Sequence, residues 1–191
     1  MCLNAAERRV IAYHEAGHAI VGLGQTLLPG LHKVTIIPRG NALGSTLSMP
    51  TEDQNIHSKT FLLEQLRMLM GGRAAEALFI GDVTNGANGD LDTAKNIARK
   101  MIHAWGMGKR LFYEPEKSDA EIEINALLTT AYEDAQRIMN EKRANVEKLA
   151  ETLLVEETLT REQVLELLQD NRDCPADPHQ KITDDSRLLS A

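Results

Sequence analysis

The segment YHEAGHAIVGLG, at residues 13 to 24, carries two histidines four positions apart with a glutamate directly after the first. On a helix, side chains at positions i and i+4 point the same way, so His14 and His18 could bind one ion. Glu15 would lie beside that ion, where a carboxylate can take a proton from water without ligating the metal. This HExxH arrangement is typical of a catalytic zinc helix.

HExxH fixes only three positions, and the alternative is a helix whose two histidines are solvated or hydrogen-bonded in a core. Two features favour the metal. Ala16 and Gly17, between the histidines, are small enough to let another segment approach. The helix is otherwise apolar, so we expect it to be buried, and buried histidines need polar partners.

Catalytic zinc usually takes three protein ligands and one water. No further histidine follows His18 on this helix, so the third ligand must come from elsewhere in the chain. The candidates are His32, His57, Glu76, Asp82, Asp90, Asp92 and His103.

Helical spacing distinguishes two of the acidic candidates. On a helix that starts near residue 88, Asp90 shares the apolar stripe of Ala94, Ala98 and Met101, whereas Asp92 lies on a polar face. A carboxylate on a buried stripe is unfavourable without a compensating cation. The first turn of a helix also favours the ionised carboxylate, the form that ligates metal. The sequence therefore favours Asp90 as a ligand over its alternative role as a helix cap.

The elements that must position these residues are mostly helical. Apolar periodicity predicts a mainly α fold, an array of about six helices with a small two-stranded β-ribbon. We expect helices at 5–23, 58–79 and about 88–106, then helical chain from 118 to about 168 with a break near Asn140 or Val155, and strands at 32–38 and 42–50. Residues 1–170 would form one domain, and the polar tail 171–191 would be disordered.

Composition excludes several classes of function. The net charge of −7 and the scattered basic residues argue against a nucleic-acid surface. The two cysteines, near opposite ends, provide neither a disulfide framework nor a CxxC metal site. No apolar run is long enough to span a bilayer, so we expect this chain to be soluble, without direct membrane contact.

Five blocks, HEAGHAIVGL, HKVTIIPRGNALGSTL, GGRAAEALF, GDVTNGANGDLDTAKNIARKMIHAWGM and the closing helices, together resemble the peptidase domain of the FtsH family. This is the family of membrane-anchored, ATP-dependent zinc metalloproteases. The resemblance extends from about Ala6 to Leu168, with the blocks in order and at similar spacing, and is far more specific than HExxH alone.

Carried over position by position, the resemblance makes His14 and His18 the histidine ligands, Glu15 the general base and Asp90 the third ligand of one Zn²⁺ per chain. Glu76 would orient a ligand histidine through the ring nitrogen that does not bind the metal. The alternative role of Glu76 is that of an ordinary glutamate on a helix surface. An edge strand would pair its backbone with an extended substrate, or else form a plain β-ribbon. The residues of that strand are Ala42, Leu43, Gly44, Ser45 and Thr46.

The implied activity is a zinc-dependent endopeptidase that hydrolyses unfolded or threaded polypeptides. The family also implies a homo-hexamer that works with an AAA-type ATPase module, in a membrane-anchored parent with its peptidase on the cytoplasmic side. The sequence contains no GxxxxGK[ST], so ATP would act only through a module absent from this chain.

The chain departs from the family pattern at Gly89, where asparagine is usual, and after Lys117, where a longer insert is usual. Two rival functions stay open: a catalytically silent assembly module with a structural metal, and a metal-free helical scaffold.

Overall fold

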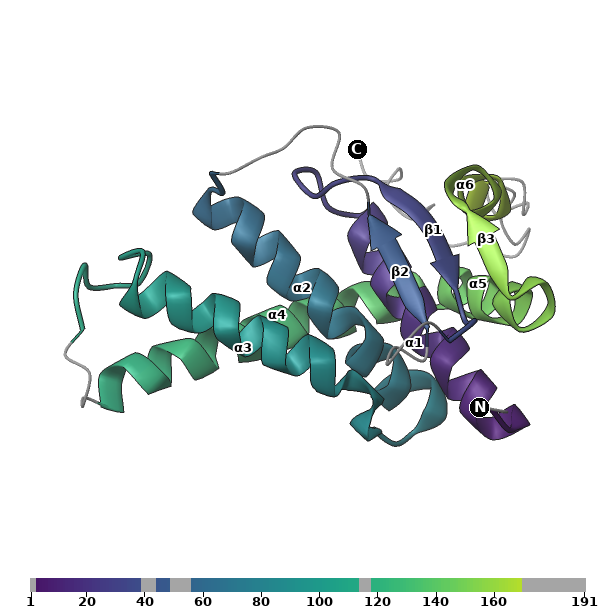
Figure 1. Cartoon of the computed structure of the whole chain (residues 1–191), viewed down its shortest axis with the longest axis horizontal. Coiled ribbons are helices and arrows are strands. Elements are labelled where there is room, and N and C mark those ends of the chain that lie inside the picture. The colour runs from purple at the N-terminus through teal and green to yellow at the C-terminus, as the bar shows by residue number, and fades with distance from the viewer. Residues whose placement is uncertain (1–2, 39–43, 49–55, 114–117, 170–191) are drawn as a thin grey trace, which may run out of the picture.

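The structure is a computed structural model that describes residues 3–38, 44–48, 56–113 and 118–169. Within those residues it contains six α-helices and a small antiparallel sheet, which confirms the mainly α class (Figure 1). The helices are α1 (Ala5–Leu23), α2 (Lys59–Ala75), α3 (Asn88–His103), α4 (Ser118–Glu141), α5 (Arg143–Glu156) and α6 (Arg161–Gln169). A π-helical turn, η1 (Glu76–Ile80), continues α2, and a 3₁₀ turn, η2 (Asn85–Ala87), precedes α3.

Local signals explain where the helices begin and end. Asn4 and Glu7 form a reciprocal capping box at the start of α1, each side chain bonding the other's backbone N–H at 2.8 Å. The long helical stretch after residue 118 breaks at Lys142, close to the expected break at Asn140. The helix predicted at 58–79 is α2 together with most of η1.

The sheet has one strand more than the predicted ribbon. Strands β1 (Leu31–Thr35) and β2 (Ser45–Ser48) pair antiparallel, with Val34 opposite Thr46, and β3 (Thr158–Thr160) pairs antiparallel on the other side of β1. Three residues between two helices carry too little alternation to predict a strand. Strand β3 forms through hydrogen bonds between distant parts of the chain. Beside it, for example, the Ile36 N–H donates to the Glu157 carbonyl at 2.9 Å.

The elements form two groups around α1 (Figure 1). Helices α2, α3 and α4 pack against one another on one side, and the sheet, α5 and α6 lie on the other. The core side chains, such as Ile20, Leu66, Met101, Met139 and Leu149, are almost completely buried. Helix α1 is therefore covered on most of its surface, and its buried stretch runs from Ile11 to Val21.

Two glycines allow α1 and α2 to cross closely. A Cβ atom on Gly17 would overlap the carbonyl oxygen of Gly71 and lie 2.8 Å from the Ala75 Cβ. A Cβ atom on Gly71 would lie 2.7 Å from the Gly17 carbonyl oxygen. Gly71 therefore lies at a close helix contact, and the small residues of the HExxH segment, Ala16 and Gly17, had suggested such an approach.

Replacing Gly17 with alanine should destabilise the fold, because the methyl group meets backbone that cannot move independently. We expect the free energy of unfolding to fall by about 1–3 kcal/mol, a typical overpacking penalty, measured by urea denaturation. Gly89→Ala is the matched control: it lies in α3 with no atom within 4 Å of its Cβ position, so the same change should raise stability by up to about 1 kcal/mol. Equal effects of the two changes would contradict this account.

Some expectations lie outside the described residues. These are the disordered tail at 171–191, the first two positions of the expected edge strand, Ala42 and Leu43, and both cysteines. Among the described helices, none combines the length and the apolar character that a membrane span requires.

Candidate metal centre

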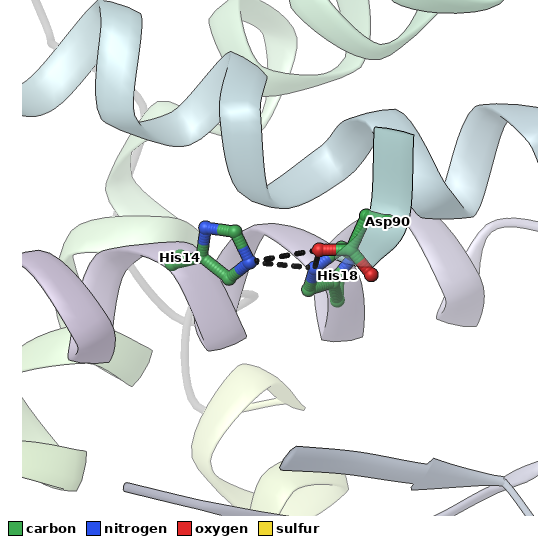
Figure 2. A group of neighbouring side chains, drawn as sticks. All are labelled: His14, His18 and Asp90. Atoms are coloured by element: carbon green, nitrogen blue, oxygen red, sulfur yellow. Dashed lines mark hydrogen bonds and ion pairs between the residues drawn. The ribbon is translucent and has the colours of Figure 1, made fainter. Parts of the chain in front are cut away.

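Three side chains from two helices meet at one point. The Nε2 atoms of His14 and His18 lie 3.0 Å apart, and Asp90 Oδ2 lies 3.2 Å from each of them. Figure 2 shows the two imidazoles and the carboxylate pointing toward one another. Both histidines are buried and Asp90 is partly buried, so bulk water reaches the point of convergence only in part.

The two helices place these side chains as their spacing predicts. His14 and His18 are one turn apart on the buried face of α1, and Asp90 lies in the first turn of α3. The N-terminus of α3 has no side-chain cap bond, so Asp90 does not act as the cap. Asp92 is exposed and accepts a bond from the Asn88 side chain at 3.3 Å.

The far side of each imidazole is held by an acceptor. His14 Nδ1 lies 2.6 Å from Glu76 Oε1, and His18 Nδ1 lies 2.8 Å from the Met68 carbonyl oxygen. A carbonyl and an ionised carboxylate can only accept, so both Nδ1 atoms donate. The Nε2 atom of each neutral ring then carries a lone pair, and both lone pairs face the Asp90 carboxylate.

This arrangement fits a divalent cation. Three electron-pair donors that converge without a hydrogen between them repel one another unless a positive charge lies among them. Ligand atoms around a tetrahedral zinc ion, each about 2.0–2.1 Å from it, are roughly 3.3 Å apart, close to the separations here. The donor set of two imidazole nitrogens and one carboxylate oxygen is also one that zinc accepts.

The pKa values of His14 and Asp90 without a metal also indicate that this point of the structure favours a positive charge. Burial lowers the pKa of His14, but the hydrogen bonds that its ring donates to Asp90 and Glu76 outweigh burial and raise that pKa to about 9. Burial raises the pKa of Asp90, and the two histidines more than reverse this and hold it well below its ordinary value. Without a metal, a proton on His14 supplies the missing charge, and a bound cation would displace it.

Glu76 reaches His14 because α2 changes its winding at that residue. The π-helical turn η1 begins at Glu76, whose side chain is fully buried. Its second oxygen, Oε2, accepts the Thr84 N–H at 2.7 Å. Burial raises the pKa of Glu76, but the bonds from His14 and Thr84 lower it below the ordinary value, so the carboxylate is ionised. Carboxylates that bond ligand histidines in this way fix the ring and increase its basicity.

An aromatic stack holds η1 against α1. The rings of Tyr13 and Phe79 are stacked with centroids 5.1 Å apart. The guanidinium groups of Arg9 and Arg143 lie over their outer faces, 4.8 Å and 5.2 Å from the ring centroids. The stack thus joins the residue beside His14 to the turn that carries Glu76.

Glu76→Gln should weaken zinc binding by about 10- to 100-fold, the usual effect of losing such a partner. The glutamine amide nitrogen cannot accept the Thr84 N–H, so one of the two bonds that orient Glu76 is lost. Affinity would be measured by competition with a chelator of known strength. Asp82→Asn is the control, because the exposed Asp82 bonds only the Val83 N–H among the described residues. Unchanged affinity in Glu76→Gln would show that Glu76 only packs.

Glu15 points toward the sheet. Its Oε2 accepts the Thr46 hydroxyl at 2.8 Å, and its side chain is buried. Burial raises the pKa of Glu15, against the opposing charges of His18 and His14 and the Thr46 bond. The carboxylate is thus electrostatically coupled to the three convergent side chains and held by β2, which forms one edge of the sheet within the described residues.

The remaining candidate ligands lie elsewhere. His32, His57, His103, Asp82 and Asp92 are exposed, and Glu76 faces the opposite side of the His14 ring. Within the described residues, His14, His18 and Asp90 form the only group of three such side chains close enough to share an ion. A hollow of about 570 Å³ between α2 and α4 is lined by none of these three.

Sequence reasoning missed three partners in this site: the Met68 carbonyl, the Thr84 N–H and the Thr46 hydroxyl as a bond to Glu15. The first two are backbone groups, which have no sequence signal. Thr46 was expected only as part of a strand that would use its backbone.

Comparison with known proteins identifies the family of this chain. The model of peptidase family M41 matches residues 1–121, which is more than half of the chain. The chain therefore belongs to peptidase family M41, and the resemblance to the FtsH peptidase domain is confirmed.

Curated relatives extend the match toward the C-terminus. The chain is 37% identical over 192 residues to the ATP-dependent zinc metalloprotease FtsH 2 of Methylacidiphilum infernorum, covering 88% of this chain and 30% of the relative. It is 37% identical over 194 residues to the ATP-dependent zinc metalloprotease FtsH of Slackia heliotrinireducens, covering 90% of this chain and 25% of the relative. It is 34% identical over 215 residues to the ATP-dependent zinc metalloprotease FtsH of Kosmotoga olearia, covering 99% of this chain and 33% of the relative. The chain spans about a quarter to a third of these relatives.

Proposed function

We propose that this chain is a zinc-dependent endopeptidase unit in which His14, His18 and Asp90 hold one Zn²⁺ and Glu15 is the general base. The observation that carries the proposal is the convergence of the two Nε2 atoms and Asp90 Oδ2 within 3.2 Å, with both Nδ1 atoms already committed as donors. Membership of family M41 and the names of the relatives support the same reading.

A zinc ion bound there would polarise the scissile carbonyl and make water acidic enough to attack near neutral pH. Glu15 takes the proton of the attacking water on a carboxylate oxygen and later gives it to the leaving nitrogen. Burial raises the pKa of Glu15 in the metal-free protein, and the positive charges of the neighbouring histidines oppose this rise. Asp90 and Glu76 stay ionised, which keeps their electron pairs available.

The substrate would be an unfolded polypeptide in extended form. Within the described residues, β2 pairs with β1 on one side only, so its other side offers backbone groups to a further strand. Gly44, Ser45 and Thr46 belong to this segment, and Thr46 also touches Glu15. Backbone pairing would bind many sequences with little side-chain selectivity.

The donor count argues against a purely structural metal. Structural zinc sites are normally closed by four protein ligands, whereas three convergent donors occur in the described part of this chain. A catalytic site needs this open fourth position.

Removal and return of the metal test the proposal directly. We expect the zinc-loaded chain to cleave an unfolded, fluorescence-quenched peptide, and dialysis against a chelator to abolish cleavage. One equivalent of zinc should restore it, whereas magnesium should not, because Mg²⁺ prefers an octahedral oxygen shell. Zinc-loaded, folded protein without any cleavage of the peptide would overturn the proposal.

The longer relatives suggest the kind of assembly in which this chain acts. We propose that the chain acts beside an ATPase module outside it, within a membrane-anchored homo-hexamer whose peptidase faces the cytoplasm, and that ATP affects it only through that module. Alone, the chain should not rapidly digest a tightly folded protein, because unfolding would depend on the ATPase.

A further inference from the structure

Strand β2 holds Glu15 through the side chain of Thr46. The Thr46 hydroxyl lies 2.8 Å from Glu15 Oε2 and 3.2 Å from the Glu15 carbonyl oxygen. The carbonyl oxygen and the ionised carboxylate oxygen can only accept, so the hydroxyl donates its one proton, with the carboxylate oxygen as the nearer acceptor. Glu15 is 6% exposed, and an acidic side chain buried to that degree depends on its hydrogen bonds to hold one orientation.

Gly44 limits the same carboxylate from a second direction. A Cβ atom at Gly44 would lie 2.7 Å from Glu15 Oε1 and 2.9 Å from the Glu15 Cγ. Residues two apart along an extended segment lie on the same face, which is why Gly44 and Thr46 both approach Glu15. Gly44 leaves space for the Glu15 carboxylate, and Thr46 supplies a directional hydrogen bond to it.

The position of this pair is set by the sheet. Thr46 is opposite Val34 and Ser45 is opposite Thr35 in the β1 to β2 ladder. The central strand β1 is itself fixed on its other side by β3. The backbone that carries the Thr46 hydroxyl is therefore paired with the central strand, and any strand that pairs with the outer side of β2 joins the same backbone.

We propose that Thr46 is a positioning residue: its hydroxyl fixes the Glu15 carboxylate where it must meet the attacking water, so that the strand offered to the substrate also sets the general base. This inference rests on the proposed peptidase function. Thr46 acts through Glu15 and itself touches no reacting atom. A misplacement of about 1 Å in a catalytic group can lower the rate by about 100-fold, so one hydrogen bond can have a large effect.

The test compares Thr46→Val, which replaces the hydroxyl with a methyl group of similar size, with Thr46→Ser, which keeps the hydroxyl. On an unfolded, fluorescence-quenched peptide with zinc-loaded protein, we expect kcat to fall about 10- to 100-fold in Thr46→Val, with KM within twofold and zinc content unchanged. Thr46→Ser should retain most of kcat. Thr158→Val is the control, because Thr158 lies on β3, the opposite edge of the same sheet, where its hydroxyl bonds that of Thr35 on β1.

A second measurement does not depend on activity. In carboxyl-labelled, zinc-loaded protein, the Glu15 carboxyl carbon resonance, assigned from its absence in Glu15→Gln, should shift in Thr46→Val and stay in place in Thr158→Val. If Thr46→Val does not fold, Gly44→Ala provides the second variant, with the same expected loss of kcat at unchanged zinc content.

The outcomes separate the two proposals. An inactive wild-type chain with zinc bound would refute the peptidase function and this inference with it. An active wild-type chain with full kcat in folded Thr46→Val, or an equal loss in Thr46→Ser and Thr46→Val, would overturn the role of Thr46 alone.

Discussion

Replacing Asp90 with alanine should remove most of the zinc from the chain, whereas replacing Asp92 should leave it bound. Asp90 Oδ2 is the acceptor that faces both Nε2 atoms, so its loss leaves two imidazoles and no negative charge to hold the ion. Losing only an outer partner weakens zinc sites by about 10- to 100-fold, and we expect the loss of this ligand to exceed 100-fold. Elemental analysis of proteins purified side by side would measure zinc per chain.

Asp92→Ala is a close control, because Asp92 is an exposed acid on the same helix, two residues away. Thermal unfolding adds a second measurement. A ligand that binds only the folded state at 100 times its dissociation constant stabilises the protein by about 2.7 kcal/mol, so added zinc should stabilise Asp92→Ala far more than Asp90→Ala. Full zinc in Asp90→Ala would show that the third ligand is another group.

Glu15→Gln should abolish peptidase activity and keep the zinc. The substitution preserves shape, and the amide oxygen can still accept the Thr46 hydroxyl, but an amide cannot take a proton from water. General-base catalysis typically contributes about 100- to 10,000-fold, so we expect kcat to fall by at least two orders of magnitude with zinc content unchanged. Cleavage of the same unfolded peptide would measure it.

Glu64→Gln is the matched control for Glu15→Gln. Both glutamates are 6% exposed, but Glu64 bonds the Thr26 hydroxyl and the Leu27 N–H, away from the three convergent side chains. Glu64→Gln should lower stability and leave kcat nearly unchanged. If Glu15→Gln retained wild-type kcat, another group would have to be the base.

The chemical groups on each helix face could be predicted from the residues alone, because helical periodicity is a local property. The spacing of His14 and His18 placed both imidazoles on one face of α1, and the apolar stripe of α3 singled out Asp90 over Asp92. Turn and strand residues near positions 32–38 and 42–50 predicted β1 and β2, although the structure shortens both. The small residues Ala16 and Gly17 indicated that another segment could approach α1, and Gly17 lies at the contact with α2.

How the helices meet, and which groups hold each imidazole ring, became visible only in the folded chain. His14 is 76 positions from Asp90 and 62 positions from Glu76 in the sequence. His18 is 50 positions from Met68, whose carbonyl oxygen it bonds. The partner of His18 is a backbone carbonyl, which every residue possesses, and the π turn at Glu76 is in contact with α1, which lies far from it in the sequence. Strand β3 is three residues long and exists because β1 offers it an edge. Such contacts leave no periodic pattern in the chain, since they arise only when distant segments pack.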